Sequence, residues 1–207
     1  MWYRYRNGYR DQIMPQDGKL VTVERGAPAV GLQEAKDYLR VDYDLEDDVI
    51  DTAILAVQDQ LVPPEGWLGR ALTDTTYRLD LPEFASEIVL PAPPFQSIES
   101  FEYVDTDGEL QSVDADLYTV AGGDPAVIVL GRNKTWPGDV DCTRPDAVQI
   151  TFKAGYGSST DVPSVIRQWI MYQVAQIHDL RQPVVVGTII SQTPFIRDML
   201  ESWRVRL

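Results

Sequence analysis

The sequence has very little of the chemistry from which catalytic and metal sites are commonly built. Among its 207 residues there is one cysteine, Cys142, and one histidine, His178. A single cysteine excludes an internal disulfide and any zinc site built on cysteines, as expected of assembly in a reducing cytosol. A single histidine inside a helical pattern is most simply a surface or core side chain, because a catalytic triad also needs a nucleophile and an orienting carboxylate. We therefore expect no catalytic residues, no metal and no cofactor.

Basic residues are also scarce: 18 lysines and arginines stand against 32 aspartates and glutamates, for a formal net charge of −14. Proteins that bind nucleic acid non-specifically replace phosphate counterions with Lys and Arg, so this composition argues against that class. An acidic surface repels DNA, which suits a conduit along which DNA slides, although solubility alone explains the same charge. The lining of such a conduit is expected to be acidic or neutral.

Long apolar runs are missing as well. No stretch approaches the roughly 18 apolar residues of a membrane span. The first six residues, Met-Trp-Tyr-Arg-Tyr-Arg, lack the apolar centre of a signal peptide. These absences predict a chain that is neither embedded in a membrane nor secreted.

Residues 1–31 are predicted to form an N-terminal arm that is rich in aromatic side chains. Arginines and then glycines and prolines accompany four aromatic residues, Trp2, Tyr3, Tyr5 and Tyr9. Aromatic and arginine side chains can stack on nucleic acid, and the same residue types are enriched in protein interfaces. Because the rest of the chain is acidic, we favour an interface with a neighbouring subunit or another protein.

Residues 32–72 carry two helical patterns joined by a polar segment. Residues 32–39 predict a short helix, and a second helix follows, capped by Asp44 or Asp47. The alternating carboxylates from Asp42 to Asp48 are spaced like a calcium-binding loop but lack its central glycine and terminal glutamate, so we interpret them as a joint. The apolar face of the second helix repeats at three- and four-residue steps: Val49, Ile50, Ala53, Ile54, Val57 and Leu61.

Residues 73–153 change to short segments of alternating apolar and polar residues, which predict a β module of about six strands. Asp107-Gly108 lies between two such segments and is a hairpin signal. The same range holds 15 acidic and five basic residues. Next, Ala154-Gly155-Tyr156-Gly157 is typical of a turn that needs positive φ angles. Helical spacing then returns, with Pro163 in the first turn, and continues to about Arg181.

This order of elements predicts an α+β fold, in which a helical bundle receives an inserted β-strand module. The bundle comprises residues 32–72 and 154–182, and the module comprises residues 73–153. The arm precedes them and a C-terminal segment, residues 183–207, follows.

An ordered series of short motifs runs from residue 32 to residue 181. It includes Leu32-Gln33-Glu34-Ala35-Lys36, Leu68-Gly69-Arg70-Ala71-Leu72, Ile88-Val89-Leu90-Pro91, Trp136-Pro137 and Ile166-Arg167-Gln168. The series resembles the head–tail connector (adaptor) family of long-tailed phages and gene transfer agents. Two features depart from that family: Leu68 stands where a threonine is usual before Gly-Arg, and Pro63-Pro64 interrupts the preceding helix.

The resemblance implies a structural protein rather than an enzyme. It implies a helical connector core and a ring of about twelve copies below the portal protein. The next tail or neck protein meets this ring, and DNA passes through its channel without specific binding. It implies a place at the head–tail junction of a virion that assembles in the host bacterial cytoplasm. The alternatives are a neck or tail-completion protein that contacts tail subunits rather than the portal and, more remotely, a small hydrolase or a carbohydrate-binding module.

The C-terminal segment is expected to dock into the portal. Beyond Pro183 and Gly187, helical spacing puts apolar residues on one side, and arginines flank them: Phe195, Ile196, Met199, Leu200 and Trp203, with Arg197, Arg204 and Arg206. The preference for docking comes from the resemblance. The alternative is that the apolar stripe packs on the protein's own helices, in which case a chain cut after Gly187 loses stability.

Overall fold

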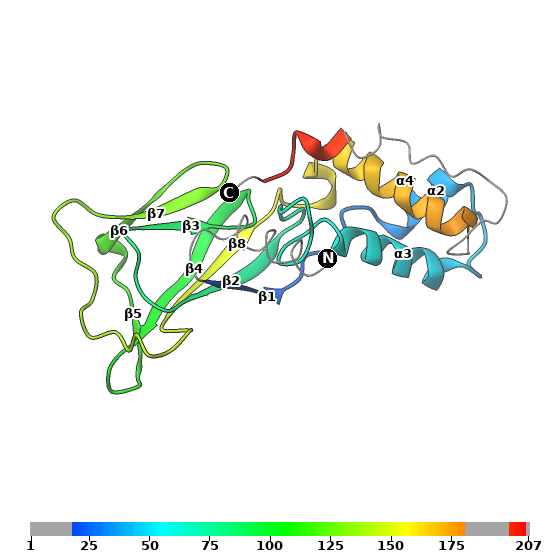
Figure 1. The fold of residues 1–207 in the computed structure, drawn as a ribbon. Coiled ribbons are helices and arrows are strands. Elements are labelled where there is room, and N and C mark those ends of the chain that lie inside the picture. The colour runs from blue at the N-terminus through cyan, green and yellow to red at the C-terminus, as the bar shows by residue number, and fades with distance from the viewer. Residues whose placement is uncertain (1–17, 181–198, 206–207) are drawn as a thin grey trace, which may run out of the picture.

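Helices and sheets occupy opposite ends of an elongated molecule (Figure 1). The computed structural model describes residues 18–180 and 199–205. In these residues there are three α-helices and two antiparallel sheets, which confirms the predicted α+β class. The helices are α2 (Leu32–Leu39), α3 (Asp47–Asp59) and α4 (Ser164–Leu180). The short helix and the long third helix therefore fall where their apolar spacing predicted them.

The larger sheet has five strands in the order β1-β2-β8-β4-β5, and the smaller has three in the order β3-β7-β6. The larger sheet consists of β1 (Lys19–Glu24), β2 (Thr75–Leu81), β8 (Val148–Ala154), β4 (Phe95–Val104) and β5 (Leu110–Ser112). The smaller one consists of β3 (Glu87–Leu90), β7 (Ala126–Leu130) and β6 (Tyr118–Ala121). Each pair of neighbouring strands is antiparallel, so strands close in sequence can be joined by short turns.

The strand content of the β module differs from the prediction at two places. Seven strands, β2 to β8, lie in residues 75–154, where about six were predicted. The three residues of β5 are all exposed and carry no alternating pattern, so this strand has little sequence signal. An eighth strand, β1, comes from the range predicted to be only an arm, and it pairs with β2 along the sheet edge. Only Leu20 of β1 is buried, so its sequence signal is weak. The sheet is therefore not built from residues 73–153 alone.

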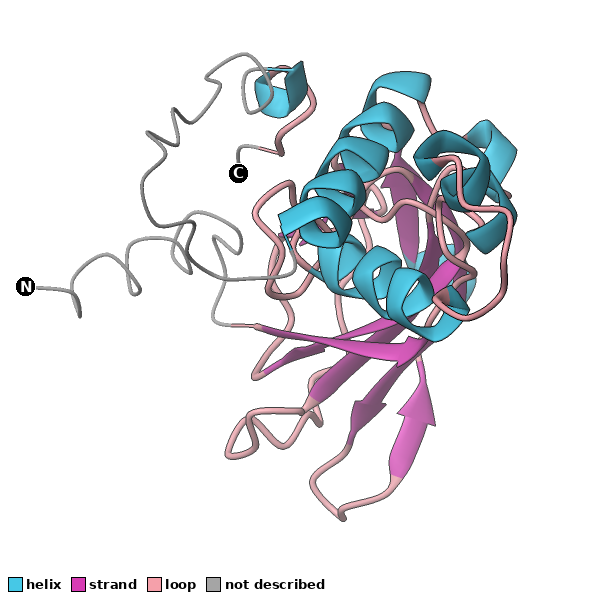
Figure 2. Ribbon diagram, turned by 90° about the vertical axis from the view of Figure 1, so that its right-hand side faces the viewer, coloured by secondary structure: helices cyan, strands magenta, loops and turns pink. Residues whose placement is uncertain are grey.

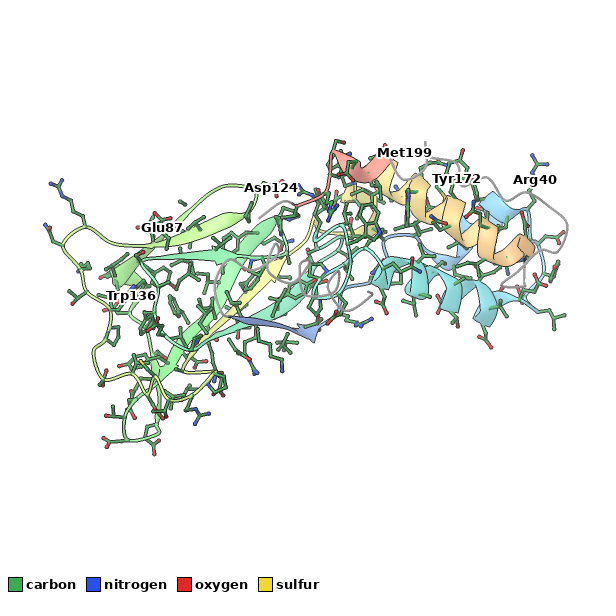
Figure 3. All side chains as sticks on the ribbon, viewed as in Figure 1. Arg40, Glu87, Asp124, Trp136, Tyr172 and Met199 are labelled. Carbon is green, nitrogen blue, oxygen red and sulfur yellow. The ribbon has the colours of Figure 1, made fainter. Side chains whose placement is uncertain are left out.

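One apolar core fills the sheet end of the molecule. The inward residues of β2 and β8 alternate with outward polar ones, and the rings of Tyr77 and Phe152 lie 5.9 Å apart in that core. At the tip, Trp136 stacks on Phe84 with ring centroids 4.8 Å apart, and its indole N–H donates to the carbonyl of Ala85 at 3.0 Å (Figure 3). This plug closes the end of the core that faces away from the helices.

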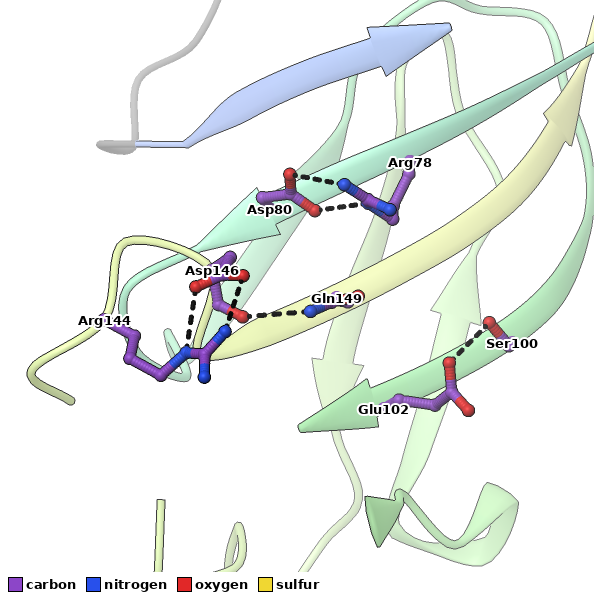
Figure 4. A network of polar contacts seen from close by, with 7 residues as sticks. All are labelled: Arg78, Asp80, Ser100, Glu102, Arg144, Asp146 and Gln149. Atoms are coloured by element: carbon purple, nitrogen blue, oxygen red, sulfur yellow. Dashed lines mark hydrogen bonds and ion pairs between the residues drawn. The ribbon is translucent and has the colours of Figure 1, made fainter. Parts of the chain in front are cut away.

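The outward face of β2, β8 and β4 is polar (Figure 4). Asp80 and Glu102 both lie in register with Gln149, one on each side of β8. Asp80 accepts from the Arg78 guanidinium at 2.7 Å, and Glu102 accepts from the Ser100 hydroxyl at 3.2 Å. The carboxylates of Asp80 and Glu102 on this face thus have hydrogen-bond partners within the protein.

A second apolar core lies among the helices, which Figure 2 shows gathered in front of the sheets. The buried residues of α3 follow three- and four-residue steps, as do those of α4, and the two helices pack along these faces. The indole rings of Trp67 and Trp169 meet edge to face, with centroids 6.0 Å apart. Val49 is the exception to the predicted face of α3, because 58% of it is exposed.

Three segments of backbone cross side by side between the sheet end and the helical end, and we call this region the waist. Tyr156 N–H donates to the carbonyl of Leu72 at 3.0 Å, and Asp74 N–H donates to that of Gly157 at 3.1 Å. The third segment joins through the Thr73 hydroxyl, which donates to the carbonyl of Ala27 at 2.6 Å. The waist consists of residues 26–27, 72–75 and 155–157.

Candidate interaction surfaces

The C-terminal segment returns to the protein's own helical core. Leu200 is fully buried in that core, Trp203 packs against it, and Val205 N–H donates to the carbonyl of Leu68 at 3.0 Å. Burying a large apolar side chain contributes about 1.5–3 kcal/mol. Leu200 and Trp203 thus pack on the protein's own helices, as the alternative to portal docking predicts. In this conformation Leu200 is not accessible to a portal protein.

The other residues predicted for docking are divided between the described and undescribed parts of the chain. Met199 lies beside Leu200 and is partly buried, as is Arg204 (Met199 is labelled in Figure 3). Phe195, Ile196, Arg197 and Arg206 lie outside the described residues, and so do the arm residues Trp2, Tyr3, Tyr5 and Tyr9. Portal docking by this segment and interface contacts by the arm remain predictions.

Arg70 fixes the returning segment to the smaller sheet. Only 9% of Arg70 is exposed, and its Nε–H donates to the carbonyl of Trp203. Its two terminal nitrogens lie 3.0 and 2.7 Å from the carboxylate oxygens of Asp124, in the loop between β6 and β7. A planar guanidinium suits this fork-like pairing. The sequence motif that contains Gly69-Arg70 does not indicate which residues Arg70 contacts, because these partners lie 54 and 133 residues away in the sequence.

The joint between α2 and α3 is held by Lys36. The side chain of this lysine is only 6% exposed, and its Nζ lies 2.8 Å from Asp44 Oδ1 and 2.6 Å from Asp47 Oδ1. The prediction that Asp44 or Asp47 caps α3 is wrong: Glu46 is the N-cap residue and makes no side-chain capping bond. The two aspartates instead neutralise a lysine that would otherwise be buried without a partner, which is costly.

The Lys36 cluster makes stability depend on pH at both ends of the scale. Hydrogen bonds to Asp44 and then Asp47 raise the pKa of Lys36 above its ordinary value of 10.5, and the bond to Lys36 lowers the pKa of Asp44 below its ordinary 3.8. The contribution of Lys36 to the free energy of unfolding is complete below pH 10.5 and is lost as pH rises through its raised pKa. The aspartate's contribution is complete above pH 3.8 and is lost as pH falls through its lowered pKa.

Replacement of Lys36 by Met should therefore lower the thermal midpoint most between these two pH values. The difference between wild type and Lys36→Met should narrow below about pH 3.8 and above about pH 10.5. Thermal unfolding followed by circular dichroism across this range measures it. Lys134→Met, which changes an exposed lysine, is the control and should leave the midpoint nearly unchanged. An equal effect of both substitutions at all pH values would contradict the assignment.

A second contact ties this joint to the end of α4. His178 Nε2 lies 2.7 Å from Glu46 Oε2, and both side chains are 15% exposed. The single histidine thus joins two helices, in line with a structural histidine. In the described residues, no group of three or more His, Cys, Asp or Glu side chains is placed to hold a metal ion.

An open cleft of about 620 Å³ lies beside the waist, between the end of β1 and strands β2, β4 and β8. Its charged side chains include Arg25 and Lys153. Arg25 pairs with Asp59 at 2.8 Å, and Lys153 lies 3.4 Å from Asp74. The cleft lining has carboxylates and cations but neither a histidine nor a cysteine, so the cleft carries no nucleophile–base pair of the triad type.

The helical end exposes apolar residues that spacing alone did not identify. Leu45, in the joint, is 90% exposed, and Val49 and Leu55 of α3 are 58% and 42% exposed. Asp48 and Asp51 are exposed between them. Among the described helices, none combines the length and the hydropathy that crossing a membrane requires.

Comparison with known proteins finds likeness at the level of structure. No family model and no curated protein matches the sequence. A chain from the neck of an empty gene transfer agent (GTA) particle computed with C6 symmetry has a TM-score of 0.69 and 24% identity, covering 91% of this chain and 97% of that chain. A chain from the virion of a native GTA particle has a TM-score of 0.70 and 23% identity, covering 91% and 96%.

A chain from the neck of a native GTA particle computed with C12 symmetry has a TM-score of 0.65 and 23% identity, covering 90% of this chain and 97% of that chain. At these identities the likeness shows a shared fold. Because it extends over nearly the whole of both chains, the helical end and the sheet end are matched together as one architecture.

Proposed function

We propose that this protein is a structural component of the neck of a tailed phage or GTA-like particle, where it forms a ring as the head–tail adaptor below the portal. The observation that carries the proposal is the fold likeness to chains of GTA particles over about nine-tenths of this chain. Two of those chains come from necks computed with C6 or C12 symmetry. The ordered motifs from residue 32 to residue 181 support the same assignment from the sequence alone.

The proposed role is mechanical rather than catalytic. A ring leaves a channel for DNA, and a net charge of −14 disfavours adhesion of a polyanion to its wall. The helices are proposed to make the contacts between copies through heterologous packing around the axis. The sheet end, which carries most of the acidic excess, is proposed to lie toward the periphery.

A tail-completion protein of the same fold is the second candidate, and binding partners discriminate between the two. Purified protein mixed with DNA-filled, tailless heads and, separately, with isolated tails should sediment with the heads if it is the adaptor. Co-sedimentation with tails alone would favour tail completion.

The ring itself is tested by negative-stain microscopy and mass measurement of the full-length protein, alone and with a portal. We expect closed rings of about twelve copies in at least one of these samples. A protein that stays monomeric in both, and binds neither heads nor tails, would refute the proposed function.

A further inference from the structure

We infer that residues 1–17 of one copy dock on the outer face of α3 of a neighbouring copy. This inference rests on the proposed ring and adds a specific contact to it. The receiving surface, which we call the acidic apolar face, consists of Leu45, Val49, Leu55, Asp48 and Asp51.

The acidic apolar face lies opposite the buried side of α3. Ile50, Ile54 and Val57 point into the helical core, whereas Asp48, Asp51 and Leu55 follow one another at three- and four-residue steps on the other side. A single exposed apolar residue is ordinary. Here, three exposed large aliphatic residues, Leu45, Val49 and Leu55, lie within one short stretch, and Leu45 is 90% exposed. Such a cluster rimmed by charge is typical of a protein contact.

The first ten residues of the chain have the complementary chemistry. They contain Arg4, Arg6 and Arg10 and no acidic residue, together with four aromatic side chains. Aromatic side chains can cover Leu45 and Val49, and the arginines can pair with Asp48 and Asp51. Aromatic and arginine residues are those enriched at the centres of interfaces.

The geometry of the chain favours a neighbour over the copy's own arm. Lys19 pairs with Asp80 at one end of β2, and Glu24 pairs with Thr76 at the other end. Beyond β1, Ala29 N–H donates to the Gln58 side chain at the C-terminal end of α3. Strand β1 thus begins at the end of its sheet away from the helices, and α3 begins at the far side of the helical end (Figure 1). Leu45, Asp48 and Val49 lie at or just before this start of α3.

The distances follow from these positions. The six residues of β1 span about 20 Å, and the thirteen residues of α3 span about 20 Å more. From Gly18 back to Tyr5 there are thirteen residues, which reach about 45 Å only when fully extended. A copy's own arm would have to be largely extended to reach the start of α3, whereas an arm from an adjacent copy can begin nearer to it.

Cross-linking between separately prepared full-length chains tests the contact. Both carry Cys142→Ser, which removes the one native cysteine, and one carries Tyr5→Cys while the other carries Leu45→Cys. After mixing and treatment with a bismaleimide, we expect a covalent heterodimer on a denaturing gel. Its yield should be at least several-fold above that of the control mixture of Tyr5→Cys with Val23→Cys, since Val23 of β1 is also exposed, at 57%.

The outcomes separate this inference from the proposed function. If rings form but the Leu45→Cys mixture gives no more heterodimer than the control, the inference is overturned and the function stands. If a chain carrying both Tyr5→Cys and Leu45→Cys cross-links only within itself, the contact is made in cis and the inference is again wrong. If no oligomer forms with or without a portal, the proposed function is wrong, and the inferred contact is wrong as well.

Charge reversal provides a second measurement. The double variant Arg4→Glu with Arg6→Glu should weaken self-association roughly five- to tenfold, and so should Asp48→Arg with Asp51→Arg. The effect is no larger because each exposed ion pair contributes little alone. The protein that carries all four substitutions should recover to near the wild-type association constant. If the combined variant assembles no better than either double variant, the pairing is refuted.

Discussion

Replacement of Leu200 by Ala will lower the free energy of unfolding by about 2–5 kcal/mol, the range for removing a fully buried leucine side chain. Leu200 is fully buried among the helices, and the neighbouring Trp203 packs on the same core. For a chain of this size the thermal midpoint should fall by roughly 5–15 °C. A chain cut after Gly187 should lose at least as much, because it also loses the Arg70 contact to the Trp203 carbonyl.

The matched control is Leu110→Ala, the same chemical change at a leucine of β5 that is 52% exposed. We expect this control to shift the midpoint by a small fraction of the Leu200→Ala effect. A truncated chain that melts like wild type but no longer binds portal-bearing heads would mean that the segment belongs to the portal contact and not to the fold.

Substitution of Gly155 by Ala should destabilise the protein by about 3–5 kcal/mol, an unusually large effect for the addition of one methyl group. Gly155 has a φ angle of 132°, where residues with a side chain are strained. A β-carbon at this position would lie 2.2 Å from the carbonyl oxygen of Thr73, inside the waist. Because the obstacle is backbone, the clash is relieved only if segments of the waist separate.

Gly122→Ala is the control, because a β-carbon there would meet no atom within 4 Å. Chemical denaturation of both variants measures the difference, and near-UV circular dichroism reports whether the aromatic packing near the waist changes. If Gly155→Ala proves as stable as Gly122→Ala, the waist is not as closely packed as its geometry indicates.

The sequence predicted best those elements whose pattern is local. The helix at residues 32–39 has the predicted bounds, and the hairpin at Asp107-Gly108 joins β4 to β5. Periodicity was less informative at the start of α3, because Val49 and Ile50 are adjacent and spacing alone did not exclude Val49 from the inner face. Strands β1 and β5 bury one residue between them, so alternation gave almost no signal.

Contacts between distant residues explain what the sequence did not reveal. Spacing identified the C-terminal stripe but not the surface it covers, and the structure shows Leu200 against the protein's own helices. Lys36 looked like one polar residue of a helix, yet it is buried because two aspartates after the helix reach back to it. Arg70 depends on partners in two separate loops. Each case is a pairing that only the tertiary fold creates.

The three crossings of the waist determine how the molecule can move. One linker lets two bodies rotate freely, and two linkers still allow a hinge motion. Three hydrogen-bonded segments that lie side by side hold the two ends of the molecule rigidly together. The protein should then move as one rigid body, so that a small rotation about the helical end displaces the distant sheet end by a larger amount. In the proposed ring, a change of diameter would then come from rotation at the contacts between subunits and not from bending within a subunit.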